Sequence, residues 1–495
     1  MPASLSPRGR QAIGLLPLLL AVLTLGFAGH AAAQTILADL VDAPKPEAPI
    51  AEAAAEAQEG SVLTMFPHPD GTRYFLAGQA NIIFQAHGPF HSPYEGTNSL
   101  LSRGEYKTSM LGTTYFAYQL SRSPKFATDG IFDIEIADGR GISEALGLAG
   151  ATNLDVVRNP NLGKPPYIAR YELHQVIGLS DKLVDTDRGP FSLATKLPER
   201  RIELFAGRMG LPDYLDINSV GSDSHLQFMN WTVDNNGAWD YAANTRGYTD
   251  ALVAEYVDPA FTARYALGLM PVVANGEDLQ YELRRANGQN FELELPHGPG
   301  FFVPALSAHK GVVRMLGFVN HANMGDYRQQ NIKFLEGVTP TPDITAHPLQ
   351  NTVKFGVGMN VEQEVSDNLR LYGRFGWNEG QHESFAYTEV DQTIAVGGDF
   401  AGRQWRRPND KIGLTFVSNA IKRDHQAYLK MGGLGFLLGD GNLDYAREDI
   451  LEGYYNLHTW RGVYYALDGQ FIEHPGYNQS RGPVLVESVR MHVDF

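Results

Sequence analysis

The C-terminal stretch 484–495 alternates between two kinds of side chain at every second position. Counting back from the terminus, one set is apolar apart from a glutamate: Phe495, Val493, Met491, Val489, Glu487 and Leu485. The other set is mostly polar: Asp494, His492, Arg490, Ser488 and Val486. A period of two predicts a β-strand with one apolar and one polar face. Such a strand fits a membrane barrel and a soluble sandwich equally well, so other parts of the chain have to separate the two.

Residues 1–33 have the features of an export signal. Two arginines near the start precede an apolar run, and a triplet of alanines ends at Ala33. This arrangement predicts a signal peptide that is cleaved after Ala33. A single membrane anchor is the alternative, but Pro17 interrupts the run, which is also shorter than the roughly 20 residues of a spanning helix.

After the signal segment, no uninterrupted apolar run approaches the length of a membrane helix. Helices and closed barrels are the structures that satisfy every backbone hydrogen-bonding group in lipid. If the mature chain lies in a membrane, it therefore does so as a closed barrel. A chain of 495 residues is long for one ordinary domain but normal for one large barrel.

Composition and motifs argue against several classes of protein. There is no cysteine, so no disulfide or thiol chemistry is available, and the net charge of −16 disfavours nucleic acid as a partner. The chain contains no H-E-x-x-H, G-x-S-x-G or Walker motif; 433–439 misses the dinucleotide fingerprint by one position, and 439–444 lacks the spacing of a calcium loop. We therefore expect no catalytic residue, no metal site and no cofactor.

Long alternating runs occupy most of the chain after residue 61. Two of them, 74–87 and 106–120, exceed typical soluble strands and reach the roughly 9–11 residues that a tilted membrane strand needs. Further strands are predicted at about 125–138, 167–179, 200–210, 247–257, 260–270, 289–296, 310–321, 351–364, 367–378, 384–400, 409–420, 443–458, 463–474 and 484–495. The total of about 16 is even, as a bacterial single-chain barrel requires.

The connections between these strands are unequal in length. Stretches 257–260 and 366–368 have the composition of tight turns, whereas 139–166, 211–246, 271–288 and 322–350 are long and polar. Short turns that alternate with long loops indicate an all-β transmembrane antiparallel barrel with short periplasmic turns and long extracellular loops.

The predicted domain organisation has three parts. They are a signal peptide (1–33), a flexible periplasmic lead rich in Ala, Pro and Glu (34–60) and an outer-membrane barrel (61–495). A short amphipathic helix is the alternative for the lead, and 61–67 is either a further strand or an inserted lead.

The densest polar cluster lies between 207 and 248, where amides, arginine and two tryptophans crowd one predicted loop. Amides and guanidinium groups bind pairs of hydroxyls, and an aromatic ring covers the apolar face of a pyranose, so this cluster suits a sugar site. The alternative is that the same groups fasten a long loop to the barrel wall.

The block 205–248, with its segments F-A-G-R-M-G, Q-F-M-N-W and N-N-G-A-W-D-Y-A-A-N-T-R-G-Y, resembles the carbohydrate-selective porins of the OprB type. Similar segments at 314–322, 432–441, 452–455, 468–478 and 481–483 extend the resemblance over roughly 70–495. One departure is His474, where the family usually has an amide. The resemblance implies a sixteen-stranded outer-membrane barrel that admits monosaccharides, glucose among them, by diffusion.

Family members narrow their pores with polar and charged side chains, arginine prominent, and with aromatic residues on loops that fold inward. Carried over to this sequence, the resemblance implies these substrate-binding or constriction residues: Arg208, Asp213, Asn230, Trp231, Asn235, Trp239, Asp240, Asn244 and Arg246.

The sequence thus predicts a passive channel rather than an enzyme, with selectivity from pore width and weak polar contacts. Expected partners are mono- or small oligosaccharides, outer-membrane lipid and the barrel-assembly machinery, which would engage the strand ending in Phe495; the chain could also form a homo-oligomer. One alternative is a general or acidic-polysaccharide outer-membrane channel. Another is a secreted β-rich glycoside hydrolase, which would need a carboxylate pair at fixed separation and would leave the apolar strand faces unexplained.

Overall fold

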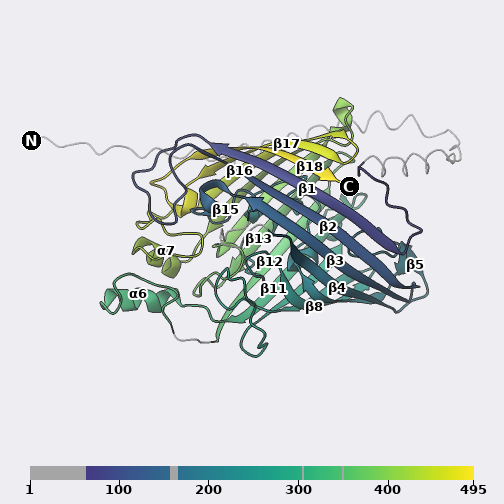
Figure 1. Ribbon diagram of the computed structural model, residues 1–495, viewed down its shortest axis with the longest axis horizontal. Coiled ribbons are helices and arrows are strands. Elements are labelled where there is room, and N and C mark those ends of the chain that lie inside the picture. Colours follow the sequence, from purple (N-terminus) through teal and green to yellow (C-terminus); the bar gives the residue numbers. More distant parts are fainter. Residues whose placement is uncertain (1–62, 157–164, 304–305, 348–350) are drawn as a thin grey trace, which may run out of the picture. The chain divides into compact units, whose positions relative to one another are not determined.

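The computed structural model describes residues 63–156, 165–303, 306–347 and 351–495. The predicted signal peptide (1–33) and lead (34–60) lie outside the described residues. Sixteen strands form one closed barrel in which each strand pairs antiparallel with its neighbour along the chain, and β1 closes the ring against β18 (Figure 1). The predicted all-β barrel of about 16 strands is therefore confirmed.

The barrel strands are β1 (Tyr74–His87), β2 (Glu105–Ser123), β3 (Phe126–Gly139), β4 (Tyr167–Gly178), β7 (Arg201–Met209), β8 (Thr249–Asp258), β9 (Phe261–Gly268), β10 (Asn287–Pro296), β11 (Gly311–Ala322), β12 (Thr352–Glu364), β13 (Leu369–Asn378), β14 (Gln392–Ala401), β15 (Lys411–Ala420), β16 (Glu448–Trp460), β17 (Val463–Glu473) and β18 (Val484–Asp494). Two short strands, β5 (Leu183–Asp185) and β6 (Lys196–Pro198), form a separate hairpin.

The helical segments are all short. They are η2 (Ile142–Ala145), η4 (Leu211–Asp213), α4 (Trp231–Asp234), α5 (Gly298–Phe302), α6 (Tyr327–Leu335), η6 (Gly402–Trp405), α7 (Arg423–Lys430) and η7 (Pro475–Tyr477). Among the described residues, none of these helices has the length and apolarity to cross a membrane.

The alternation predicted for 484–495 separates the two faces of the barrel wall. Val489 of β18 lies opposite Phe84 of β1, and both point outward with 47% and 41% of their surface exposed. One step along the register, Ser488 and Gln85 point inward and share a hydrogen bond of 3.0 Å. Apolar side chains outside and polar ones inside are the arrangement of a barrel whose outer face is covered by lipid.

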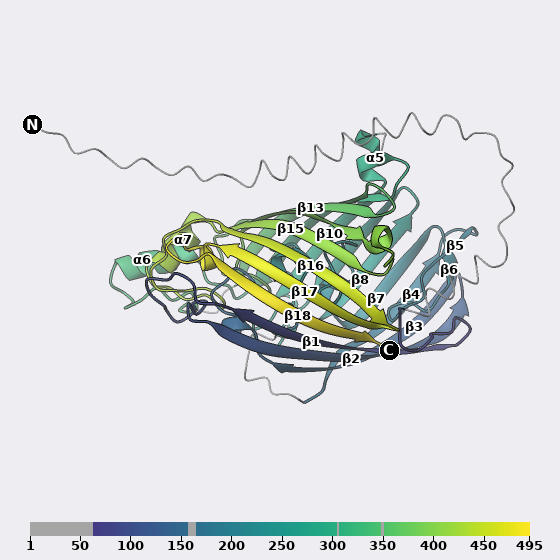
Figure 2. The same ribbon diagram turned by 90° about the horizontal axis from the view of Figure 1, so that it is seen from above.

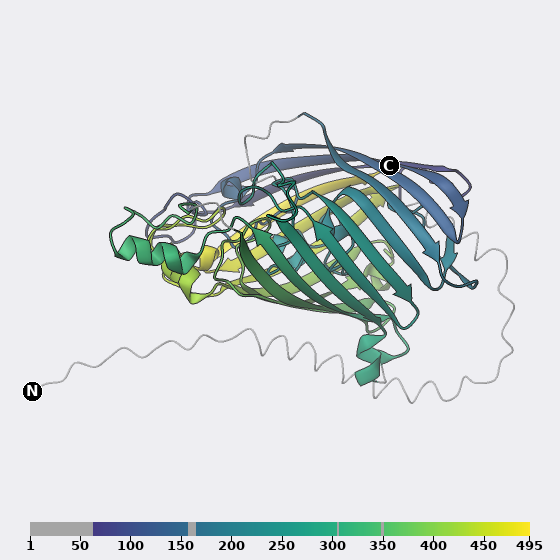
Figure 3. The same cartoon turned by 90° about the horizontal axis from the view of Figure 1, so that it is seen from below.

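Long and short connections lie at opposite ends of the barrel. We call the end that carries the long loops the loop end, and the other the turn end. Figures 1 and 2 show α6 and α7 at the loop end, and the C terminus with β5 and β6 at the turn end. Figure 3 shows the green and teal strands of one wall running tilted between these two ends.

The described parts of all four long loops predicted from the sequence lie at the loop end, but three connections at the turn end are not the short turns that were expected. The tight turns at 259–260 and 365–368 are confirmed. In contrast, 179–200 forms the hairpin of β5 and β6, 297–310 contains α5, and 402–410 contains η6. Most of the connections at the turn end are therefore short, as predicted, but not all of them are.

Two predicted strands begin too early in the sequence. Residues 384–391 alternate in polarity but precede β14, because Phe385 and Ala386 donate their backbone N–H groups to Asp240 in a loop and not to a strand. Similarly, β16 begins at Glu448 and not at 443. The described part of 61–67 forms bends and is not a further strand.

Candidate functional site

The connection between β7 and β8, residues 210–248, folds into the barrel interior, and we call it the inward loop. Most of its side chains are buried, including Asn230 and Trp239. A polar segment can be buried in this way only when its donors and acceptors find partners. Asn230 illustrates the point: its Oδ1 accepts the backbone N–H of Thr232 at 3.0 Å and caps α4.

Most of the wall residues that hold the inward loop lie on one side of the barrel, from β10 round to β18. Trp239 Nε1 donates to Asn290 Oδ1 on β10 at 2.8 Å. At the far end of the same wall, Arg490 of β18 donates from Nη1 to the backbone oxygen of Ser224 at 2.6 Å. Between them, further wall residues bind the loop: Asn320, Asn360, Arg374, Asn378, Glu452 and Gln470.

Because the loop is fastened to that wall, open space remains along the opposite wall. A cavity of about 540 Å³ lies between the inward loop and the barrel. Its lining residues that belong to barrel strands all come from β1–β4: Gln79, Leu111, Tyr115, Glu135, Tyr167 and Arg170. We call this space the lane. It is bordered by a rigid sheet on one side and by the inward loop on the other.

An ion pair joins the two borders of the lane. Arg170 of β4 donates from Nε and Nη2 to the two carboxylate oxygens of Asp213 in η4, at 2.9 and 3.0 Å. Its Nη1 also donates to Asp133 of β3 at 3.3 Å. A planar guanidinium held at both edges has one orientation, so its remaining surface is presented to the cavity in a fixed position.

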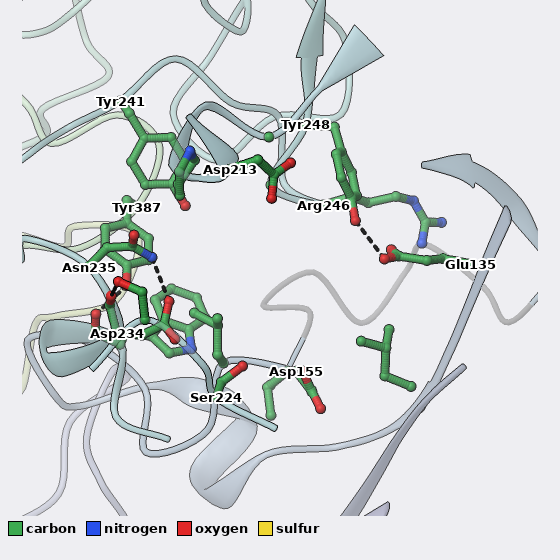
Figure 4. A pocket seen from close by; sticks show the side chains of 18 of the residues that line it. Glu135, Asp155, Asp213, Ser224, Asp234, Asn235, Tyr241, Arg246, Tyr248 and Tyr387 are labelled. Atoms are coloured by element: carbon green, nitrogen blue, oxygen red, sulfur yellow. Dashed lines mark hydrogen bonds between the residues drawn. The ribbon is translucent and has the colours of Figure 1, made fainter. Parts of the chain in front are cut away.

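Aromatic and charged groups alternate beside this pair. Tyr248 and Tyr167 donate their hydroxyls to Glu135, at 2.6 and 2.7 Å. The guanidinium carbon of Arg246 lies 3.9 Å from the centre of the Tyr167 ring, close enough for a cation–π interaction. Figure 4 shows Arg246, Tyr248 and Glu135 together on one side of the cavity.

The facing side of the cavity is mainly aromatic. The rings of Trp231 and Tyr387 stack at 5.5 Å with an angle of 5° between their planes, and Tyr241 packs on Tyr387 at 4.9 Å. Trp231 Nε1 donates to the backbone oxygen of Asn153 at 2.7 Å, which fixes the indole. Figure 4 shows Tyr241 and Tyr387 across the cavity from Glu135.

Asp234 contributes a carboxyl group that gains or loses its proton near neutral pH. It accepts a hydrogen bond of 2.7 Å from Asn235 Nδ2. Burial raises the pKa of Asp234 to about 7, although the Arg374 guanidinium acts in the opposite direction. The lane thus contains a carboxyl group that loses its proton in the physiological range.

A second ion pair holds the inward loop to the β3–β4 connection. His225 Nε2 lies 3.0 Å from Asp155 Oδ1. Burial disfavours the charged imidazole, but the Asp155 carboxylate outweighs it and raises the pKa of His225 to about 9. For Asp155, burial acts to raise the pKa, and the charge and hydrogen bond of His225 lower it below the usual value.

The structure brings five of the nine sequence-predicted site residues to the lane. They are Asp213, Trp231, Asn235, Asn244 and Arg246. Asn244 shapes the turn beside Arg246, since its Oδ1 accepts the Arg246 backbone N–H at 3.0 Å. Whether these five contact a sugar remains a prediction.

The other four lie outside the lane. Arg208 pairs in register with Tyr171 and Asp250 on the outward face of the wall. Three are anchors of the inward loop: Asn230, Trp239 and Asp240. Asp240 illustrates this role, because it forms a buried ion pair with Lys354 of β12 at 3.1 Å. The loop-fastening alternative therefore describes these three residues.

Several lining residues were not predicted. Glu135 and Arg170 lie on inward positions of two correctly predicted strands, so the alternation itself could have identified them. Tyr387 could not have been identified in this way, because its segment was predicted as a strand but forms a loop before β14. Among the described residues, no group of three or more His, Asp or Glu side chains has the arrangement of a metal site.

Comparison with known proteins assigns the family. Residues 191–495 match the family model described as carbohydrate-selective porin, OprB family. The chain belongs to the OprB family. A search of curated protein sequences gave no match.

One solved porin structure shares the fold of this OprB-family chain, and others resemble it less. The high-pH structure of Pseudomonas putida OprB superposes with a TM-score of 0.62 at 15% identity, covering 85% of this chain and 94% of that one. Its low-pH structure gives 0.43 at 12% identity, with 90% and 96% covered. The channel DcaP of Acinetobacter baumannii gives 0.47 at 9% identity, with 88% and 100% covered. Only the first likeness is close enough to demonstrate a shared fold.

The family and the closed barrel together define the class of the protein. It is a carbohydrate-selective porin of the bacterial outer membrane, and hence a channel. Sugars are the class of solute that this family selects. The sequence resemblance to the OprB type is confirmed.

Proposed function

We propose that this porin admits monosaccharides such as glucose by passive diffusion along the lane between the inward loop and β1–β4. The observation that carries the proposal is the cavity of about 540 Å³, which combines polar groups on the β3–β4 side with stacked aromatic rings on the other. A volume of this size is typical of small-molecule sites.

The lining chemistry suits a neutral sugar. Arg170 and Arg246 offer guanidinium donors, Glu135 and Asp234 offer carboxyl oxygens, and Trp231 offers an apolar surface for ring C–H groups. Each such contact is weak and exchangeable. Several weak contacts in series let a solute enter and also leave, which passive transport requires.

Charge argues against the acidic-polysaccharide alternative. Carboxyl groups outnumber cationic groups along the lane: Glu135, Asp155, Asp213, Asp223 and Asp234 face Arg170, Arg246 and the protonated His225. A polyanion would be repelled by this surplus, whereas a neutral sugar experiences no net force from it.

The same proposal includes export and assembly. The segment 1–33 would be removed after Ala33, the lead 34–60 would lie in the periplasm, and the barrel 61–495 would insert with the help of the assembly machinery. The supporting feature for that last step is the alternating strand that ends in Phe495. Assembly into a homo-oligomer is part of the same proposal.

Single-channel recording of the purified protein in a planar bilayer tests the function. We expect an ion current that falls saturably as glucose is added, and a weaker effect for a disaccharide that fits the lane less well. Trp231→Ala should weaken the block, whereas the outward Phe132→Ala should not. A current that no sugar reduces would contradict the proposal.

A further inference from the structure

The turn-end connection 179–200 is a hairpin whose tip is tightly shaped. After the paired strands β5 and β6, Thr186 donates its backbone N–H to Thr195 at 3.0 Å. At the tip, Gly189 donates to the backbone oxygen of Ser192 at 2.9 Å. The chain therefore reverses over four residues, with Phe191 at the point of reversal. We call residues 183–198 the turn-end hairpin.

The far part of this hairpin lies inside the barrel. Leu193 is buried with three residues of the barrel wall, Phe75 of β1, Ala117 of β2 and Ile131 of β3. All three occupy inward positions of their strands. The backbone N–H of Leu193 also donates to the buried Asp129 of β3 at 3.0 Å. The hairpin tip is thus packed on the inner face of β1–β3, the wall that borders the lane.

An arginine fixes the tip in this position. Arg188 donates from Nη2 to Thr72 Oγ1 at 3.0 Å and to the backbone oxygen of Tyr74 at 2.7 Å. Its Nη1 donates to the backbone oxygen of Leu193 at 3.2 Å. One side chain therefore connects both arms of the hairpin to the start of β1, and these hydrogen bonds fix the position of the tip.

Phe191 extends from this tip into the lining of the lane. It is the one lining residue contributed by the turn-end hairpin. The guanidinium carbon of Arg170 lies 5.1 Å from the centre of its ring, and the Tyr214 ring lies 6.3 Å away. The same arginine that binds Asp213 is consequently covered on the turn-end side by an aromatic ring.

We propose that the turn-end hairpin forms a second constriction of the lane, and that Phe191 is a specificity-determining residue on the periplasmic side of it. This inference rests on the proposed function, since it concerns the same path. A sugar that has passed the inward loop must pass the Phe191 ring before it reaches the periplasm. The ring narrows the exit and offers an apolar surface next to a guanidinium group, so it delays sugars more than ions.

Opposite substitutions at Phe191 test the proposal. Phe191→Ala should raise the single-channel conductance and shorten the residence time of glucose by about 2- to 10-fold, because one aromatic contact is lost. Phe191→Trp should lower the conductance. Opposite changes of conductance in the two variants indicate a steric constriction, whereas a folding defect would change the conductance of both variants in the same direction. Phe132→Ala, which removes an outward ring from β3, is the matched control.

The outcomes separate this inference from the proposed function. If both Phe191 variants conduct like the wild type while Trp231→Ala weakens the sugar block, the hairpin constriction is wrong and the sugar pore stands. If glucose blocks no variant but the two Phe191 substitutions shift the ion conductance in opposite directions, the constriction stands and the proposed function fails. Glucose added from the turn end should enter Phe191→Ala faster, and equal entry rates would contradict the inference.

Discussion

Arg170 on β4 and Asp213 in the inward loop form a two-point ion pair, with Nε–Oδ2 at 2.9 Å and Nη2–Oδ1 at 3.0 Å. The pair links the wall on one side of the lane to the loop on the other. Only 10% and 20% of the two side chains is exposed, so solvent screens the pair weakly. The width of the lane therefore depends on this link.

Breaking the link should loosen the pore. Arg170→Met leaves the Asp213 and Asp133 carboxylates without their shared cation, and we expect the free energy of unfolding to fall by about 3 kcal/mol. Asp213→Asn keeps one acceptor oxygen and should cost less. Denaturant unfolding in detergent measures both, and open-channel current noise should rise in the same order. A double mutant whose loss equals the sum of the single losses would show that the two residues do not interact.

Two arginines of the same predicted cluster should behave differently toward sugar. Arg246 lines the lane, whereas Arg208 lies on the outward face of β7. Arg246→Ala should weaken glucose block by about tenfold, the typical effect of losing a hydrogen bond to a charged group. Arg208→Ala should leave the block unchanged. Titration of the single-channel current with glucose compares the two variants, and equal effects would exclude the assigned lane.

The barrel was predictable from the sequence because its strands have two chemically different environments. Lipid on one side and a polar lumen on the other impose the same alternation on every strand, as at Val489 and Ser488. The alternation failed at Tyr387, where an alternating stretch is buried against the inward loop. Its polarity pattern reflects contacts with a distant segment, which local periodicity does not contain.

The site was predictable only in part, because residue type does not fix direction within a loop. Trp231 and Trp239 belong to one polar block and have the same side chain, yet one lines the lane and the other donates to Asn290 on the wall. That difference depends on partners far along the chain. The turn-end hairpin was missed for a related reason, since the buried packing of Leu193 depends on three separate strands.

The charge of Asp234 should make ion selectivity depend on pH. Burial raises its pKa to about 7, so the carboxyl group is neutral below that pH and negative above it. We therefore expect selectivity for cations to increase as the pH rises through about 7. Reversal potentials in a salt gradient at about pH 6 and about pH 8 measure the change. Asp234→Asn should abolish this step, and a step of unchanged size in that variant would assign it to another group.

The pair of His225 and Asp155 should hold the inward loop over a defined pH range. The pKa of His225 is raised from 6.5 to about 9, so its contribution is full below pH 6.5 and is lost as the pH rises through about 9. The pKa of Asp155 is lowered from 3.8, so its contribution is present above pH 3.8 and is lost as the pH falls through the lower value. The pair is therefore intact from about pH 4 to about pH 9.

Current noise against pH tests this range. The noise should stay low across it and increase above about pH 9 in the wild type. In His225→Gln the current noise should be high at all pH values, and the step-like increase above about pH 9 should be absent. His382→Gln, which breaks a histidine–glutamate pair outside the lane lining, is the matched control and should behave like the wild type. A step that persists in His225→Gln would show that a different group holds the loop.

A charge on the outer face should destabilise the barrel according to its depth in the membrane. Val489 lies in the middle of β18, opposite Phe84 and Leu467, whereas Val493 lies near its turn end, opposite Ala80. Val489→Arg places a guanidinium group in the hydrocarbon and should cost about 2–4 kcal/mol of unfolding free energy. Val493→Arg should cost about 0–1 kcal/mol, because its side chain reaches the interface. Denaturant unfolding in phospholipid vesicles compares the same substitution on the same face of one strand. Equal costs at the two positions would mean that this face of β18 is not covered by lipid.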